Sequence, residues 1–186
     1  MNILISTGGT RERIDSVRSI ANTATGRLGS LVAGCFDKVP ETERIFYVCT
    51  PNAPRPESAR AEITVIEDTA GLEKAVREIL RHNRVDAVIH SMAVSDYRVR
   101  SVTTPARIAE SAVNASVIEA IDRAPSLEQD AKIRSGENRL VIVLEPTPKI
   151  ISLFFINPIH IPRVSDTSWL LAWLAGGPEA RGDRLS

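Results

Sequence analysis

Apolar residues along the chain form short uninterrupted runs that alternate with longer stretches of helical spacing. The run at 2–6 (NILIS) ends at Thr7-Gly8-Gly9-Thr10, which predicts a buried strand stopped by a glycine turn. The next stretch predicts a helix over 27–39, because its apolar positions fall on one helical face and hydroxyl residues precede it as a possible cap. The chain therefore begins with a strand, a loop and a helix.

The same alternation continues through the middle of the sequence. Strands are expected at 44–49 (RIFYVC), 62–66 (EITVI) and 86–90 (DAVIH), and a helix at 69–82. These strand runs are too apolar for either face to be exposed to water, which favours a parallel sheet covered by helices. The fold class that we predict is α/β, a Rossmann-like, doubly wound and mostly parallel sheet with helices on both faces.

The second half gives weaker patterns. We expect a loop over 91–104, a helix over about 108–123 and a strand over 139–145 (RLVIVLE). The segment 153–175 has neither helical nor strand period, and a polar tail that begins at Gly176-Gly177-Pro178 follows it. We therefore expect a folded domain over 1–153 and a divergent C-terminal tail over 154–186, disordered or replaced.

The charge balance limits the classes of partner. The 186 residues carry 23 basic and 23 acidic side chains, so a general nucleic-acid binder with a large positive field is excluded, and a metabolite is the expected partner. No apolar run reaches about 18 residues, and no leader is recognisable at the start, so we expect a cytoplasmic protein without a membrane role. Cys35 and Cys49 lack metal-type spacing and are interpreted as reduced structural residues.

Two loops near the first strand are candidates for anion binding. In Gly8-Gly9-Thr10, paired glycines could let backbone N–H groups face a phosphate, although a plain turn is the alternative; the pattern is neither GxGxxG nor a P-loop. The loop 22–29 leads into a helix N-terminus, where the helix dipole favours negative charge by roughly 0.3 to 2 kcal/mol. An ordinary hydroxyl cap is the alternative for this second loop.

Further candidates follow later strands. Asp96 could accept hydrogen bonds from ribose hydroxyls or hold a magnesium-bound water, or it could simply close an Asx-turn. His90 ends a predicted buried strand and is interpreted as a core histidine rather than a base. Lys132 lies in a polar stretch where a lysine is usually only solvated, whereas Lys149 follows a strand and two prolines, which suggests a rigid pocket wall. No metal-ligand set and no catalytic triad can be assigned.

Four blocks in order carry a family resemblance. They are GGTRERIDSVRSIANTATGRLG at 8–29, IHSMAVSDY at 89–97, AKI at 131–133 and PTPKIIS at 146–152. Together they resemble the phosphopantothenate-cysteine ligases of coenzyme A biosynthesis, in their stand-alone bacterial form. The resemblance covers about residues 1–153.

The resemblance implies a function and a set of site residues. The family joins 4′-phosphopantothenate to cysteine through an acyl-cytidylate, with CTP as co-substrate and Mg²⁺, and commonly as a homodimer. By matching positions it implies catalytic roles for Asn22 and Lys132, and it assigns no metal-ligating residue. The implied nucleotide-binding residues are Gly8, Gly9, Thr10, Asp96, Lys132, Pro148, Lys149, Ile150 and Ile151, and the implied substrate-binding residues are Asn22, Thr25, Gly26, Ala93 and Val94.

The sequence departs from the family in two places. Ala24 stands where the family commonly has serine, and after residue 153 the family's GF-type motif, lysine-bearing helix and AND-type segment are not recognisable. We interpret the ending as frameshifted or replaced. Two alternatives follow: an impaired relic that still binds nucleotide or phosphopantothenate or serves as a partner subunit, and a nicotinamide-dependent oxidoreductase. The second is disfavoured because GxGxxG and an acidic residue at the end of the second strand are lacking.

Overall fold

The computed structural model describes residues 1–134, 136 and 138–156 and divides the chain into two compact units. Among the described residues, unit 1 comprises Met1–Thr10, Asn22–Val94 and 149–156, and unit 2 comprises Arg11–Ala21 and those within Ser95–Pro148. The tail expected at 154–186 lies outside the described residues from position 157 on.

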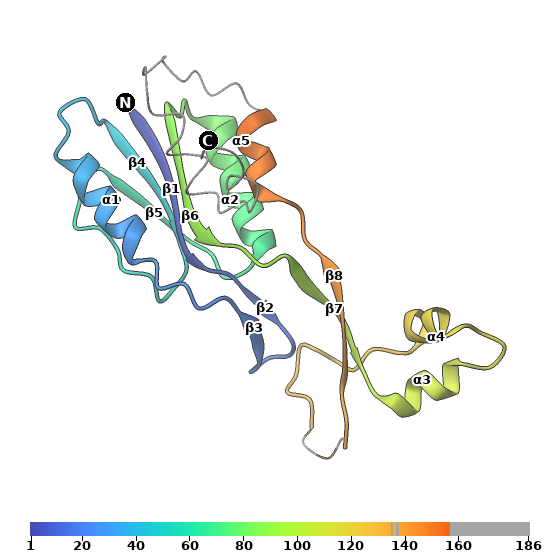
Figure 1. Ribbon diagram of the computed structural model, residues 1–186. Helices are drawn as coiled ribbons and strands as arrows, with labels where there is room; N and C mark the ends of the chain where they lie inside the picture. Colours follow the sequence, from blue (N-terminus) through green and yellow to red (C-terminus); the bar gives the residue numbers. More distant parts are fainter. Residues whose placement is uncertain (135, 137, 157–186) are drawn as a thin grey trace, which may run out of the picture. The chain divides into compact units, whose positions relative to one another are not determined.

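The sheet of unit 1 is parallel and has four strands. Their order is β5-β4-β1-β6, and every neighbouring pair runs in parallel. The apolar runs predicted as strands form it, which confirms the predicted α/β class (Figure 1). The strands are β1 (Asn2–Gly9), β4 (Arg44–Cys49), β5 (Ala61–Val65) and β6 (Ala87–Ala93).

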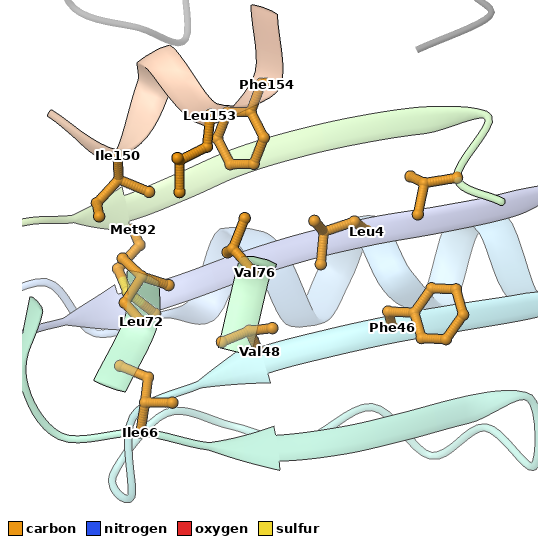
Figure 2. Packing of buried hydrophobic residues seen from close by; sticks show 11 residues of the cluster. Leu4, Phe46, Val48, Ile66, Leu72, Val76, Met92, Ile150, Leu153 and Phe154 are labelled. Carbon is orange, nitrogen blue, oxygen red and sulfur yellow. The ribbon is translucent and has the colours of Figure 1, made fainter. Parts of the chain in front are cut away.

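Helices cover both faces of this sheet, because alternate residues of each central strand point to opposite sides. Ile3 and Ile5 of β1 belong to a core cluster that includes Ala33 of helix α1 (Arg27–Asp37). Leu4, between them, belongs to the other cluster, which includes Leu72 of helix α2 (Thr69–His82). Figure 2 shows this second cluster, to which the 3₁₀ turn η1 (Ile150–Ser152) and the short helix α5 (Leu153–Ile156) also contribute.

Two predicted details of unit 1 are wrong. Strand β1 does not stop at Thr7 but continues through Gly9, because Gly8 and Gly9 pair in register with Met92 and Ala93 of β6. Helix α1 is not capped by a hydroxyl side chain; it begins after Gly26, which has a φ of 75° and offers no side-chain cap.

Unit 2 contains two antiparallel strand pairs. Strands β2 (Arg11–Arg13) and β3 (Ser19–Ala21) form a short hairpin that the sequence pattern does not reveal. Strand β7 (Tyr97–Thr103) pairs with β8 (Val141–Pro146). The strand predicted at 139–145 is thus confirmed as β8, but the loop predicted at 91–104 is wrong, because β6 runs to Ala93 and β7 fills most of the remainder.

The single helix predicted at about 108–123 is also wrong. The structure has two helices of unit 2 there, α3 (Pro105–Ser111) and α4 (Val117–Arg123). The second helix starts anew at a capping box, in which the Ser116 hydroxyl accepts from the backbone of Glu119 and the Glu119 carboxylate accepts from the backbone of Ser116. Within the described part of the chain, no helix combines the length and apolar character needed to cross a bilayer.

Candidate functional site

In unit 1 two hydrogen bonds join Asn22 to the ends of β1 and β6, and a third joins these two ends to each other. The backbone N–H of Asn22 donates to the carbonyl of Thr10 (3.0 Å), and its side-chain Nδ2 donates to the carbonyl of Ala93 (3.2 Å). That carbonyl also accepts from the backbone N–H of Thr10 (3.0 Å). Since the group facing Ala93 must be a donor, the orientation of the Asn22 carboxamide is determined by its partner.

Three of the predicted glycines make this junction sterically possible. A Cβ on Gly9 would lie 2.3 Å from the carbonyl oxygen of Asn22. A Cβ on Gly26 would lie 2.6 Å from Cβ of Ala53, and one on Gly8 would lie 2.2 Å from Oγ1 of Thr50. Gly8 and Gly26 also have positive φ values of 97° and 75°, which residues with a side chain rarely adopt. The glycines therefore let the loop at Asn22 approach the ends of β1 and β4 closely.

The backbone at Gly8-Gly9-Thr10 does not form the anion-facing turn that we expected. Gly8 and Gly9 lie in register within the β1–β6 ladder, and the amide of Thr10 already donates to Ala93. The N-terminus of α1 keeps the geometry of an anion site better, because its cap residue Gly26 supplies no side-chain acceptor. The Thr25 hydroxyl accepts only one long bond there, of 3.4 Å from the amide of Arg27.

The other candidate binding residues of unit 1 differ in how far their side chains are exposed to solvent. Thr25, Lys149 and Ile151 are exposed. Val94 packs against the α2-side core, and Ile150 is only 3% exposed within that cluster. The side chain of Ile150 therefore belongs to the core, and any ligand contact along this segment would come from its neighbours.

His90 of β6 has the environment of a core histidine, as predicted. Its Nδ1 is joined to Oγ of the fully buried Ser6 by a hydrogen bond of 2.5 Å, and its ring lies 5.4 Å from that of Phe154, centroid to centroid. Burial lowers the pKa of His90 from 6.5 to about 4. A histidine with that pKa is poorly matched to general-base chemistry near neutral pH.

In unit 2, Asp96 and Pro148 lie on two segments that are fastened together. Thr147 donates its backbone N–H to the carbonyl of Asp96 (3.0 Å) and its hydroxyl to the carbonyl of Ser95 (2.5 Å). Asp96 and Pro148 are both exposed, so the fastening fixes their backbones and leaves their side chains on the surface of the unit.

Lys132 is exposed on unit 2, beside the buried Ile133. The peptide groups of Ile133 are bound by Asp15 and Arg18 of the β2–β3 hairpin. Asp15 is not among the residues predicted from the sequence, although it lies inside the first family-like block. The sequence Ile14-Asp15-Ser16-Val17 was a local sign of an Asx-turn, but nothing local showed a partner more than a hundred positions away.

No metal site is evident in residues 1–134, 136 and 138–156, which contain no group of three or more His, Cys, Asp or Glu side chains suited to holding an ion. Cys35 and Cys49 are free thiols, as expected. Cys35 is exposed, whereas burial raises the pKa of the Cys49 thiol, which keeps it in the unreactive protonated form.

Comparison with known proteins shows which family this chain resembles. Residues 1–120 match the family described as "DNA/pantothenate metabolism flavoprotein C-terminal domain". The coenzyme A biosynthesis bifunctional protein CoaBC of Thermococcus kodakarensis is 28% identical over 149 residues, which are 80% of this chain and 29% of that protein.

Solved structures agree with this match. The DNA/pantothenate metabolism flavoprotein from Streptococcus pneumoniae is 34% identical, with a TM-score of 0.69 over 87% of this chain and 66% of that one. A Cab2 mutant in complex with phosphopantothenate-cysteine shares the fold at 13% identity, with a TM-score of 0.54 over 81% of this chain and 57% of that one.

The chain thus spans less than a third of its curated CoaBC relative and about two thirds of the Streptococcus pneumoniae structure. The family match nevertheless extends over more than half of the 186 residues and includes the β1 end, Asn22 and Ala93. The chain therefore belongs to the family of the DNA/pantothenate metabolism flavoprotein C-terminal domain, which confirms the resemblance to the phosphopantothenate-cysteine ligases.

Proposed function

We propose that residues 1–153 form a domain that ligates 4′-phosphopantothenate to cysteine with CTP, in the cytoplasm and as a homodimer. Family membership and the CoaBC relatives support a role in coenzyme A biosynthesis. The observation that carries the proposal is the position of Asn22 at the carboxyl ends of β1 and β6, where the Thr10 carbonyl binds its backbone N–H and the Ala93 carbonyl binds its carboxamide. In open parallel sheets, ligands bind at this end of the strands.

The reaction has two steps. In the first, a carboxylate oxygen of phosphopantothenate attacks the α-phosphorus of CTP, the bond to the β-phosphate breaks, and pyrophosphate leaves. In the second, the amine of cysteine attacks the acyl carbonyl, its proton is lost, and CMP leaves with the bonding electron pair as the amide forms. Activation is needed because a carboxylate has no good leaving group, and the nucleotide supplies one, which divides a difficult step into two easier ones.

Asn22 is proposed to act on the acyl group. One hydrogen of Nδ2 is already used by Ala93, so the second can donate to the acyl carbonyl oxygen, where negative charge develops during attack by the amine. Thr25, Gly26, Ala93 and Val94 are proposed to bind the substrate around it. The N-terminus of α1 would favour an anionic group of that substrate.

The nucleotide roles are assigned residue by residue. The cationic Lys132 would neutralise phosphate charge as pyrophosphate forms, and the exposed carboxylate of Asp96 would accept from ribose hydroxyls. Pro148, Lys149, Ile150 and Ile151 are proposed to line the nucleotide site, and Gly8, Gly9 and Thr10 to shape it. Among these residues Asp96 is the one carboxylate, so Mg²⁺ is proposed to arrive with the triphosphate, where it would neutralise charge and leave only a few ligand positions to the protein.

Oxidoreductase chemistry fits the unit 1 strands less well. A dinucleotide site of the Rossmann type places an acidic residue after the second strand of the sheet, whereas β4 ends at Cys49 and is followed by the buried Thr50. An impaired relic that binds nucleotide or phosphopantothenate without catalysis is the alternative to be tested. The sequence departs from the family after position 153, and this departure concerns binding of the triphosphate.

The test is a half-reaction assay. The protein is incubated with phosphopantothenate, CTP and magnesium, with and without cysteine, and pyrophosphate and CMP are followed. The ligase releases pyrophosphate without cysteine and CMP only with it. Thermal stabilisation by the ligands without any pyrophosphate would instead identify a binding-only relic, and sedimentation of the same preparation tests the homodimer.

A further inference from the structure

Asp15 of unit 2 is a buried carboxylate that has no role in the function proposed so far. It lies at the tip of the β2–β3 hairpin, and its side chain is 0% exposed. Its Oδ1 accepts from the backbone amides of Val17 (2.9 Å) and Arg18 (2.8 Å), which closes an Asx-turn. An Asx-turn needs only one side-chain acceptor, so Oδ1 alone is enough to close it.

The second oxygen, Oδ2, reaches a distant part of unit 2. It accepts from Nε (2.9 Å) and Nη2 of Arg18, and from the backbone N–H of Ile133 (3.2 Å). Nη2 of Arg18 also donates to the carbonyl of Ile133 (3.2 Å). Both backbone groups of Ile133 are therefore bound by the hairpin, one by the carboxylate and one by the guanidinium.

These hydrogen bonds from Asp15 and Arg18 to Ile133, which we call the anchor, orient the segment around Ile133. The side chain of Ile133 is 6% exposed, whereas the neighbouring Lys132 and Arg134 are exposed. Consecutive Cα atoms are about 3.8 Å apart, so a fixed Ile133 places the Cα of Lys132 within narrow limits. The lysine side chain then starts from a defined point on the surface of unit 2.

The Asp15 carboxylate of this anchor stays ionised throughout the physiological pH range. Hydrogen bonds from the Arg18 side chain, together with those from the amides of Val17, Ile133 and Arg18, outweigh desolvation and hold the pKa of Asp15 well below its usual range. Charge-assisted bonds are stronger than those of a neutral acceptor. A serine or an asparagine could close the turn, but neither could accept from Ile133 and Arg18 with an ionised oxygen.

We propose that Asp15 is a positioning residue, whose carboxylate fixes the Ile133 peptide and thereby places Lys132 for the attack on the nucleotide. The inference rests on the proposed function, because it assigns Lys132 to the pyrophosphate-forming step. Positioning matters for that step, since a misplacement of about 1 Å at a catalytic group can cost roughly 100-fold in rate.

The variant that isolates this role is Asp15→Asn. The amide oxygen can replace Oδ1 and keep both turn bonds, whereas the NH₂ group in place of Oδ2 would point a donor at the donors of Ile133 and Arg18. Asp122→Asn is the matched control, because Asp122 is an exposed aspartate of unit 2 that pairs with Arg100. Asp15→Ser is a second variant, whose hydroxyl can close the turn but is too short to reach Ile133.

Two measurements decide the matter. Hydrogen exchange at the Ile133 amide should be at least about tenfold faster in Asp15→Asn, with exchange at Val17 and Arg18 unchanged. In a double-mutant cycle, Asp15→Asn should slow pyrophosphate release about tenfold or more in the parent chain and have no further effect when Lys132 is Gln. Asp122→Asn should change neither quantity.

The outcomes separate the two claims. No pyrophosphate from the parent chain overturns the proposed function and the placement of Lys132 with it, whereas anchoring of Ile133 is judged independently by exchange. If the parent chain is active but the Asp15 and Lys132 effects multiply, Asp15 acts on general stability and the positioning role is wrong. Unchanged exchange at Ile133 in both Asp15 variants would overturn the anchor itself.

Discussion

The side-chain Nδ2 of Asn22 donates a 3.2 Å hydrogen bond to the carbonyl of Ala93, the same carbonyl that accepts from the backbone N–H of Thr10. One backbone oxygen thus fixes both the end of β1 and the carboxamide of the loop that follows. The contact joins two segments separated by 71 positions, and both belong to the blocks that carry the family resemblance.

The first prediction concerns Asn22→Asp. The substitution keeps the shape of the side chain but turns an oxygen toward the Ala93 carbonyl, where the two acceptors repel each other, and it removes the donor proposed for the acyl carbonyl. We expect amide formation to slow by roughly 100-fold, the typical loss when one oxyanion donor is removed. Quenched-flow measurement of both half-reactions checks this.

Pyrophosphate release should change far less in this variant, because the first step does not use that donor. Thr23→Ser, an exposed substitution one residue away, is the control and should leave both steps unchanged. Equal losses in the two half-reactions would contradict the role of Asn22.

A second prediction concerns the charge of Lys132. Lys132→Gln keeps much of the side chain's length but removes the cation, so pyrophosphate release should fall roughly tenfold or more, with a larger deficit at low salt. Lys74→Gln changes an exposed lysine of α2 in the same way and should be silent. An unaffected first half-reaction in Lys132→Gln would remove the lysine from the mechanism.

The sequence predicts unit 1 well because its central strands β1 and β4 are buried on both faces. The run at 44–49 is apolar after Arg44, the run at 2–6 is apolar between Asn2 and Ser6, and the helix predicted at 69–82 has the bounds of α2. The sequence does not predict strand β7, because Arg98 and Arg100 interrupt its apolar pattern. Arg98 lies opposite Glu145 in β8 and pairs with it at 2.7 Å, so the strand is stabilised by a cross-strand ion pair that no local pattern reveals.

The break between α3 and α4 shows how spacing can mislead. Val113, Val117 and Ile118 have helical spacing but are 73–74% exposed, so their periodicity does not mark a buried face. Asn114 has a φ of 54°, a left-handed conformation that ends a right-handed helix. Asparagine tolerates this conformation better than most residues do, but its presence alone does not require it.

The candidate site was predictable to the extent that it lies at strand ends and in family-like blocks. Asn22, Gly9 and Ala93 lie together in unit 1, as those positions suggested. The use of the Thr10 amide within the β1–β6 ladder was not predictable, because it depends on the register of the two strands. The Asp15 contact to Ile133 spans 118 positions, and such a distance leaves no periodic signal.

A third prediction follows from the half-buried His90. Its pKa is about 4 in the folded chain against 6.5 when unfolded, so between these values the unfolded state binds more protons. The free energy of unfolding should therefore fall as the pH decreases from 6.5 to 4, by up to about 3 kcal/mol from this group. Denaturant titrations at several pH values measure this slope.

His90→Asn is the informative variant, because the amide nitrogen can replace Nδ1 beside Ser6 and does not titrate. The slope between pH 6.5 and 4 should flatten in this variant. His82→Asn changes an exposed histidine of α2 and should leave the slope essentially as it is. A slope that His90→Asn does not alter would assign the acid sensitivity to other groups.

Asp15 affects stability at lower pH than His90 does. Its pKa is depressed in the folded chain, so the stabilisation that it contributes is lost only as the pH falls below about 4.

The last prediction uses two glycines of the same helix, α1. A Cβ on Gly34 meets no atom within 4 Å, so Gly34→Ala gains helix propensity without a clash and should raise the free energy of unfolding by roughly 0.5 to 1 kcal/mol.

A Cβ on Gly29 would lie 2.4 Å from Cβ of Thr7 and 2.5 Å from its Oγ1. Thr7 is fully buried in β1, and its hydroxyl donates to the carbonyl of Gly26 (3.0 Å), so it cannot give way without breaking that bond. Gly29→Ala should therefore lower the free energy of unfolding by roughly 1 to 3 kcal/mol, as overpacked sites do. Equilibrium denaturation of the two variants gives both values, and effects of the same sign would show that α1 does not pack against β1 through Gly29.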